Sequence, residues 1–251
     1  MNDSMASFSK SIDSALGKAN PNFDRLVKDS QGNLYELHTQ EQSESCVMAS
    51  IAMVKSIYFK QCYIDDQEQL AITISQKYPG AFNPASGTSA ENVPYVLNEM
   101  QIKNSGCVYP SSDEDLLEKL QNNVNDDCPA ILFVAWKGSG AHAVVCVRVV
   151  GSTKLVILDP WYGLQEEQVL SSGWWIFKDT SLPYIATCIA KQRCNAGEAG
   201  QGSFFGVVFT KRNKWEHEDY SFEILRTGLK ILERDFEMSY KFIRSQINFW
   251  D

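Results

Sequence analysis

The chain has 251 residues, of which 44% are hydrophobic and 22% charged, an ordinary composition for a globular protein with one substantial core. Its formal net charge of −8, with no cluster of Lys and Arg, argues against a nucleic-acid partner, because phosphate binding requires a concentrated positive surface. No stretch approaches the roughly 18 consecutive apolar residues that a membrane helix requires, so we expect no membrane span.

The first 30 residues are polar and rich in serine, and they lack the apolar core of a secretory signal. A short amphipathic stretch, 8–16, is followed by the helix-breaking pair Asn20-Pro21. We predict a flexible N-terminal arm over 1–30 and synthesis in the cytosol. Translocation into a host or target cell, by a route that needs no such signal, stays open.

Helices are expected in the hundred residues that follow. The segment 46–59, CVMASIAMVKSIYF, is almost entirely apolar or small, and its length favours a buried helix over a strand. Two more helices are expected over 65–77 and 90–100. A fourth should begin at Ser111, because Ser111-x-x-Glu114 has the pattern of a capping box ahead of several leucines.

After Pro129 the hydrophobic period changes to that of strands. The runs AILFVAW, HAVVCVRVV and KLVILD are separated by turns with Gly and Ser, which predicts neighbouring antiparallel strands. Later candidates are 174–177, 184–189 and 203–210. Helices followed by a sheet predict an α+β fold.

From Asp219 onward, apolar residues recur at steps of three and four, which predicts a long C-terminal helix. We expect this helix, within 216–251, to pack on a domain that covers 31–215. A coiled coil that binds a partner is the open alternative, and nothing in the sequence indicates the oligomeric state.

The seven cysteines form an odd set without a CxxC pair, so neither a zinc site nor a disulfide framework is indicated. We expect reduced, mostly buried thiols and neither a metal nor a cofactor. The cysteines are Cys46, Cys62, Cys107, Cys128, Cys146, Cys188 and Cys194.

Cys46 stands at the first turn of the predicted helix 46–59. A helix N-terminus offers partial positive charge and unpaired backbone N–H groups, which favour a thiolate and can hold an oxyanion after attack on a carbonyl. A thiolate nucleophile also needs a base. The alternative for Cys46 alone is a small core residue.

The chain has only three histidines. His142 follows the glycine-rich run 137–141 and opens a predicted strand, where a side chain can face a cleft. His38 and His217 are expected to be solvated surface residues.

Asp159 ends the predicted strand 154–159, and an aspartate there is costly unless it is paired or partly solvated. If 141–150 and 154–159 form a hairpin, their far ends meet, and His142 and Asp159 lie side by side. This is the geometry of a base and the residue that orients it.

A cysteine at a helix start, a histidine at a strand start and Asp-Pro followed by a glycine resemble the papain-like cysteine hydrolase superfamily. H-A-V-V followed by L-D-P-W-Y-G is most similar to bacterial branches, namely bacteriocin-processing peptidase domains and secreted effector cysteine proteases or glutamine deamidases. The resemblance covers roughly 35–163. It implies a papain-like α+β fold in which the nucleophile helix packs on an antiparallel sheet, with catalytic Cys46, His142 and Asp159.

The resemblance also implies a glutamine about six positions before the cysteine, which completes the oxyanion hole. Gln40 stands at this spacing, and Gln42 is the fallback. The segment SESCVMAS lacks the glycine before and the tryptophan after the cysteine that plant and lysosomal relatives have. The preference of those relatives for their substrates is therefore not implied.

The implied reaction is hydrolysis of an amide through a thioester, with a protein or peptide as the substrate. A protease and a glutamine deamidase share these steps and differ only in which amide enters the cleft. A binding protein that keeps the fold without turnover is the alternative of another class.

Overall fold

The computed structural model describes residues 24–40, 44–60, 67–83, 86–138, 140–168, 170–171, 174–178 and 200–212. The chain divides into two compact units, Met1–Lys211 and Arg212–Asp251. The predicted C-terminal helix within 216–251, the predicted strand 184–189 and most of the expected arm 1–30 lie outside the described residues. Within the expected arm, Asp24–Lys28 forms strand β1.

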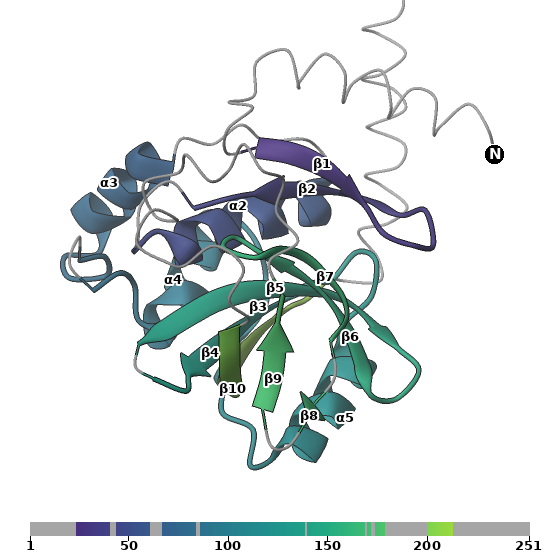
Figure 1. The fold of residues 1–251 in the computed structure, drawn as a ribbon. Coiled ribbons are helices and arrows are strands. Elements are labelled where there is room, and N and C mark those ends of the chain that lie inside the picture. The colour runs from purple at the N-terminus through teal and green to yellow at the C-terminus, as the bar shows by residue number, and fades with distance from the viewer. Residues whose placement is uncertain are drawn as a thin grey trace, which may run out of the picture. The chain divides into compact units, whose positions relative to one another are not determined.

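The main sheet has eight strands, and all of their pairings are antiparallel. Its order is β7-β6-β5-β4-β10-β9-β8, and β3 pairs with β10 beside this path (Figure 1). The strands are β3 (Asn104–Val108), β4 (Ala130–Trp136), β5 (Ala141–Val150), β6 (Lys154–Asp159), β7 (Gly163–Gln168), β8 (Leu170–Ser171), β9 (Trp174–Phe177) and β10 (Gly200–Thr210). The predicted α+β class and the run of antiparallel strands after Pro129 are confirmed.

The helices precede or interrupt the first strands of this sheet. They are α2 (Cys46–Phe59), α3 (Gln67–Lys77), the 3₁₀ turn η1 (Ala90–Asn92), α4 (Val93–Glu99) and α5 (Asp113–Asn123). A separate hairpin joins β1 to β2 (Leu34–His38). In Figure 1, α2 lies between this hairpin and the main sheet.

The cap of α5 lies one residue later than the sequence predicted. The Ser112 hydroxyl accepts a hydrogen bond from the Asp115 amide at 3.2 Å, and the Asp115 carboxylate accepts one from the Ser111 amide at 2.8 Å. The predicted box of Ser111 and Glu114 is therefore wrong in register, because Asp115 is the carboxylate that reaches back.

Helix α2 is buried on almost every side, which explains why its sequence shows little polar face. It packs on the sheet face that presents Phe133 and Val145, while α5 packs on the opposite face with Val134 and Val144. Side chains alternate between the two faces of a strand. By this alternation, the side chains of His142 and Asp159 belong to the sheet face opposite α2. Both residues lie at the same end of the sheet, near the start of β5 and at the end of β6.

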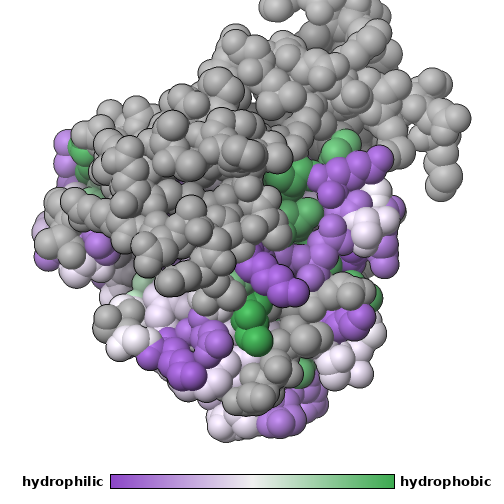
Figure 2. All heavy atoms as spheres, viewed as in Figure 1, coloured by the Kyte–Doolittle hydropathy of each residue, from purple (hydrophilic) through white to green (hydrophobic). Residues whose placement is uncertain are grey.

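Large exposed apolar side chains are few in the described part of the chain: Leu34, Ile72, Tyr95, Tyr109 and Phe205. Among the coloured residues of the face shown in Figure 2, small apolar patches lie next to polar residues. None of the described helices is long and apolar enough to cross a bilayer. The described residues also contain no group of three or more His, Cys, Asp or Glu side chains that could hold a metal ion.

Candidate active site

Cys46 is the first residue of α2, as the sequence predicted, and it lines a cleft beside the sheet. The residue before it, Ser45, occupies the N-cap position, but its side chain does not cap the helix. The Ser45 hydroxyl instead donates to the Gln67 side-chain oxygen at 3.0 Å. The first-turn amides of α2 are therefore not capped by Ser45, at the end of the helix where the dipole is positive.

Gln67, the first residue of α3, connects two segments that border the cleft. Its side chain is almost fully buried, and its Nε2 donates to the Thr39 carbonyl at 2.9 Å. Thr39 precedes Gln40, and Ser45 precedes Cys46. One buried amide thus joins the segment that carries Gln40 to the start of the helix that carries Cys46.

Gln40 is 1% exposed and lines the same cleft as Cys46. Its backbone N–H donates to the Pro160 carbonyl at 3.1 Å, so the Gln40 segment is also attached to the turn that follows Asp159. The fallback Gln42 lies outside the described residues. The structure therefore brings all four sequence-predicted residues, Gln40 among them, to one region.

His142 and Asp159 lie side by side, and the adjacency expected from the hairpin is confirmed. His142 Nε2 is 2.8 Å from Asp159 Oδ1, with both side chains buried. Asp159 Oδ1 also accepts from the backbone amides of Trp161 at 2.7 Å and Tyr162 at 3.1 Å. The turn after β6 thus fixes the carboxylate that faces the imidazole.

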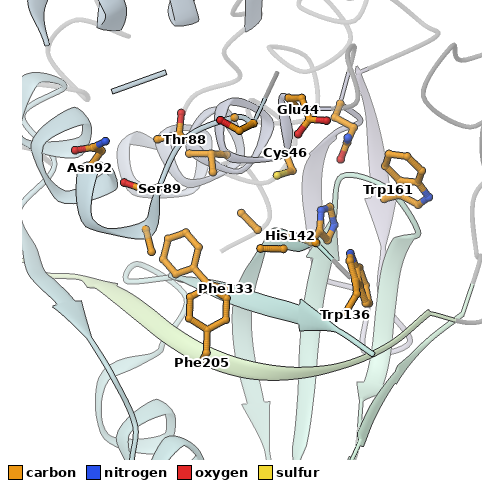
Figure 3. A pocket seen from close by; sticks show the side chains of 18 of the residues that line it. Glu44, Cys46, Thr88, Ser89, Asn92, Phe133, Trp136, His142, Trp161 and Phe205 are labelled. Atoms are coloured by element: carbon orange, nitrogen blue, oxygen red, sulfur yellow. The ribbon is translucent and has the colours of Figure 1, made fainter. Parts of the chain in front are cut away.

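The pKa of His142 is raised to about 10 by its neighbours. Burial of the imidazole opposes this shift, but the charge and hydrogen bond of Asp159 and the hydrogen bond and charge of Cys46 outweigh it. Because Nε2 faces Asp159, Nδ1 is left for Cys46. Figure 3 shows the Cys46 sulfur and the His142 ring turned toward each other.

Two tryptophans surround the imidazole, and sequence reasoning did not single out either of them. The Trp136 ring is stacked on His142 with centroids 5.4 Å apart, and the Trp161 ring meets His142 edge to face with centroids 6.5 Å apart. Trp136 ends the run AILFVAW, and Trp161 follows Asp-Pro in LDPWYG. An aromatic residue at the end of a strand and another after Asp-Pro were the signals that could have identified them.

The cleft has a volume of about 1530 Å³ and extends to both sides of Cys46 and His142. Phe133 and Phe205 lie on one side, whereas Trp136 and Trp161 lie on the other (Figure 3). The two phenylalanine rings are 6.0 Å apart. The residues that line the cleft therefore lie on both sides of Cys46 and His142.

The other described thiols have settings that differ from that of Cys46. Burial raises the pKa of Cys146 to about 12, and burial also raises the pKa of Cys107. Cys128 is buried as well. Among the described cysteines, only Cys46 both lines the cleft and interacts with a histidine.

The expectation for His38 was wrong. It is fully buried rather than solvated, and its Nε2 lies 3.0 Å from Glu36 Oε1. The physical reason is that β2 packs against α2, so the inward end of this strand has no access to water. His38 does not line the cleft. His217 lies outside the described residues.

A buried helix that begins with a cysteine, packed on an antiparallel sheet whose strand ends carry a paired histidine and aspartate, defines the papain-like class. Residues 28–176, more than half of the chain, match the family model described as papain-like cysteine protease AvrRpt2. The chain belongs to this family.

Among solved structures, a G161 variant of the Salmonella effector SpvD is similar to this chain at 12% identity. The match covers 85% of this chain and 94% of that one, with a TM-score of 0.31. No curated protein matches the chain.

Proposed function

We propose that this protein is a cysteine protease with Cys46 as the nucleophile, His142 as the base and Asp159 as the residue that orients the histidine. The observation that carries the proposal is the His142 imidazole held between Asp159 and Cys46 inside an open cleft. Membership of a cysteine protease family supports it independently.

In the first half of the reaction, the Cys46 thiolate attacks the carbonyl carbon of the scissile amide, and a C–S bond forms. The negative charge moves to the carbonyl oxygen, which the Cys46 backbone N–H and the Gln40 side-chain amide stabilise. The His142 imidazolium gives its proton to the amide nitrogen, and the C–N bond breaks. The amine product leaves, and an acyl thioester remains on Cys46.

In the second half, neutral His142 removes a proton from water, and the oxygen attacks the thioester carbonyl. The C–S bond breaks, the acid product leaves and the thiolate–imidazolium pair is restored. Throughout the cycle Asp159 accepts the Nε2–H hydrogen bond, which keeps Nδ1 directed at Cys46 and stabilises the imidazolium.

The shape of the cleft favours a protease over the deamidase alternative. A deamidase needs access for the end of one glutamine side chain, whereas this cleft continues on both sides of the reactive groups. The products separate the two activities. Cleavage yields two fragments, while deamidation leaves one chain about one mass unit heavier and releases ammonia.

The first test is alkylation of Cys46 by iodoacetamide between pH 5 and 9, followed by mass spectrometry, in the wild type and in His142→Ala. An ordinary thiol titrates near pH ~8.5. We expect Cys46 to react well below that pH in the wild type and much more slowly in the variant, with Cys128 as the internal control. If Cys46 is not alkylated, or if its alkylation rate is the same in His142→Ala, the proposal is wrong. The alternative is then a binding protein that keeps the fold without turnover.

Digestion of a peptide library is the second test, with Cys46→Ala and a matched Cys128→Ser variant. We expect cleavage by the wild type and by Cys128→Ser, and none by Cys46→Ala. Ammonia release without cleavage would instead establish the deamidase.

We also propose that the protein is a bacterial effector that acts in another cell, which the resemblance to secreted effector proteases supports. Detection of an epitope-tagged chain in the cytosol of contacted host cells tests this. A tag confined to the producing cell under inducing conditions contradicts it.

A further inference from the structure

Trp136, the last residue of β4, presents the face of its indole to His142. The ring centroids are 5.4 Å apart and the planes are tilted by 25°. Val134 is the ladder partner of His142, and Trp136 follows Val134 by two positions on the same strand. The two rings therefore occupy the same face of the sheet as diagonal neighbours, within reach of a long or aromatic side chain.

The position of the indole is fixed by its surroundings. The rings of Phe177 and Tyr162 meet it edge to face, at centroid distances of 5.2 Å and 5.9 Å. Across the ladder, β10 carries Gly200 and Gly202. A Cβ would lie 2.9 Å from Trp136 Cζ3 at the first and 3.1 Å from Trp136 Cε3 at the second. Both glycines thus leave the space that the indole fills.

The charged groups near the imidazole come from several elements. Asp159 at the end of β6 and Cys46 at the start of α2 face it directly. Glu44, just before α2, and Lys137, just after β4, line the same cleft. Trp136 adds no ionisable group. Its contribution is the negative electrostatic face of an aromatic ring, which attracts a cation within about 6 Å of the ring centroid.

We propose that Trp136 is a positioning residue that holds the His142 imidazolium in place and stabilises its protonated form through the stacked indole. The proposal deepens, and rests on, the proposed ion pair of Cys46 and His142. Loss of the indole removes an interaction that is stronger for the cation than for the neutral ring, so the imidazolium loses its proton at lower pH.

The experiment follows the titration of His142 by NMR in the full-length protein. Because the chain has only three histidines, its imidazole Cε1–Hε1 signal can be assigned with His142→Gln. In Trp136→Leu we expect the signal to lose the upfield shift caused by the stacked ring. We also expect its titration midpoint to fall by about 0.5 to 1 pH unit. Trp136→Phe should keep most of both effects.

Two further variants separate this role from a general packing role. In Gly200→Ala the three atoms nearest to the new methyl group belong to Trp136 and Tyr162 and not to His142, so the indole must shift, and we expect the midpoint to fall as in Trp136→Leu. Trp174→Leu removes another half-buried tryptophan, which lies outside the cleft lining, and should leave the midpoint unchanged.

An unchanged midpoint in folded Trp136→Leu and Gly200→Ala, or an equal fall in Trp174→Leu, overturns the proposal. If circular dichroism shows that Trp136→Leu does not fold, the titration midpoints of Gly200→Ala and Trp136→Phe are compared. A lower midpoint in Gly200→Ala than in Trp136→Phe supports the proposal, and equal midpoints overturn it. Failure of the proposed function gives a different result. Cys46 would then be alkylated at the same rate in the wild type and in His142→Ala, independently of the titration midpoint.

Discussion

One carboxylate oxygen of Asp159, Oδ1, accepts hydrogen bonds from three donors: the His142 ring and the backbone amides of Trp161 and Tyr162. The side chain is fully buried, so its charge acts on the imidazole with little screening by water. At the scale of single residues, this carboxylate is the strongest neighbour that raises the pKa of His142.

Asp159→Asn keeps the shape of the side chain and removes its charge. The two backbone amides that donate to Oδ1 should hold the amide oxygen toward His142, so the tautomer is kept. Loss of the charge alone weakens the imidazolium, and we expect the rate of peptide cleavage to fall on the order of 10- to 10²-fold. Steady-state kinetics with a cleaved peptide measure this. A change of less than threefold would mean that Asp159 has only a structural role.

The same pair makes stability depend on pH. The pKa of His142 is raised to about 10 in the folded protein, against an ordinary value near 6.5. The stability that the protonated pair contributes is therefore complete below about pH 6.5 and is lost as pH rises toward 10. Urea unfolding should show the largest difference between wild type and Asp159→Asn near pH 6 and a shrinking difference through pH 8 and 10. A difference that grows with pH has the wrong sign.

At the scale of elements, the start of α2 and the end of β2 are tied together by Gln67 of α3. Its amide donates to the Thr39 carbonyl and its oxygen accepts from the Ser45 hydroxyl. The residues that follow these two partners are Gln40 and Cys46. A shift at this junction would move the proposed oxyanion site relative to the nucleophile.

Gln67→Met keeps the volume of the side chain and removes both hydrogen bonds. We expect a loss of about 1 to 3 kcal/mol in the free energy of unfolding, because buried polar partners lose a bond. We also expect a fall in kcat with little change in KM. Gln121→Met on α5, an exposed glutamine that donates to the Ser152 carbonyl, is the matched control and should change neither. Equal effects in both variants would contradict a specific role for the junction.

The start of α2 at Cys46 and the hairpin of β5 and β6 could be predicted because each depends on local signals. An apolar run with a polar flank defines the helix, and two strands joined by a short turn bring His142 to Asp159. The stack on Trp136 could not be predicted in the same way. It depends on Gly200 and Gly202, which are more than sixty residues further along the chain.

The burial of His38 was missed for a similar reason. In the sequence this residue lies in a polar neighbourhood, and only the packing of β2 on α2 removes it from water. In the sequence, Gln67 is one polar residue in a charged stretch. Its two hydrogen bonds are to Thr39 and Ser45, which lie 28 and 22 residues earlier in the chain. Contacts between segments that lie far apart in the chain produce no periodic pattern of hydrophobic residues, so they cannot be predicted from a single sequence.

At the scale of the described fold, a buried ion pair ties the β1–β2 hairpin to the main sheet. Arg148 Nη2 of β5 lies 2.6 Å from Asp29 Oδ2, and the Asp29 side chain is fully buried. Asn33 and Tyr35 also donate to this carboxylate. The hairpin ends at His38, two residues before Gln40, which lines the cleft. A shift of the hairpin would therefore displace Gln40.

Arg148→Met leaves the Asp29 carboxylate buried without its cation. We expect a loss of about 2 to 4 kcal/mol in the free energy of unfolding, measured by urea denaturation. Lys28→Met removes an exposed cation from the same hairpin and should cost little. If the two variants lose the same stability, the ion pair does not hold the hairpin.

The proposed catalytic groups come from opposite faces of one sheet: Cys46 packs on the face that α2 covers, whereas the alternation of side chains assigns His142 and Asp159 to the other face. Ninety-six positions separate the cysteine from the histidine, and only the docked helix brings them together. An unfolded or half-folded chain therefore carries an ordinary thiol and three unremarkable histidines. On the proposed mechanism, we therefore expect the chain to be unreactive while it is being synthesised and to become reactive only where it completes its fold.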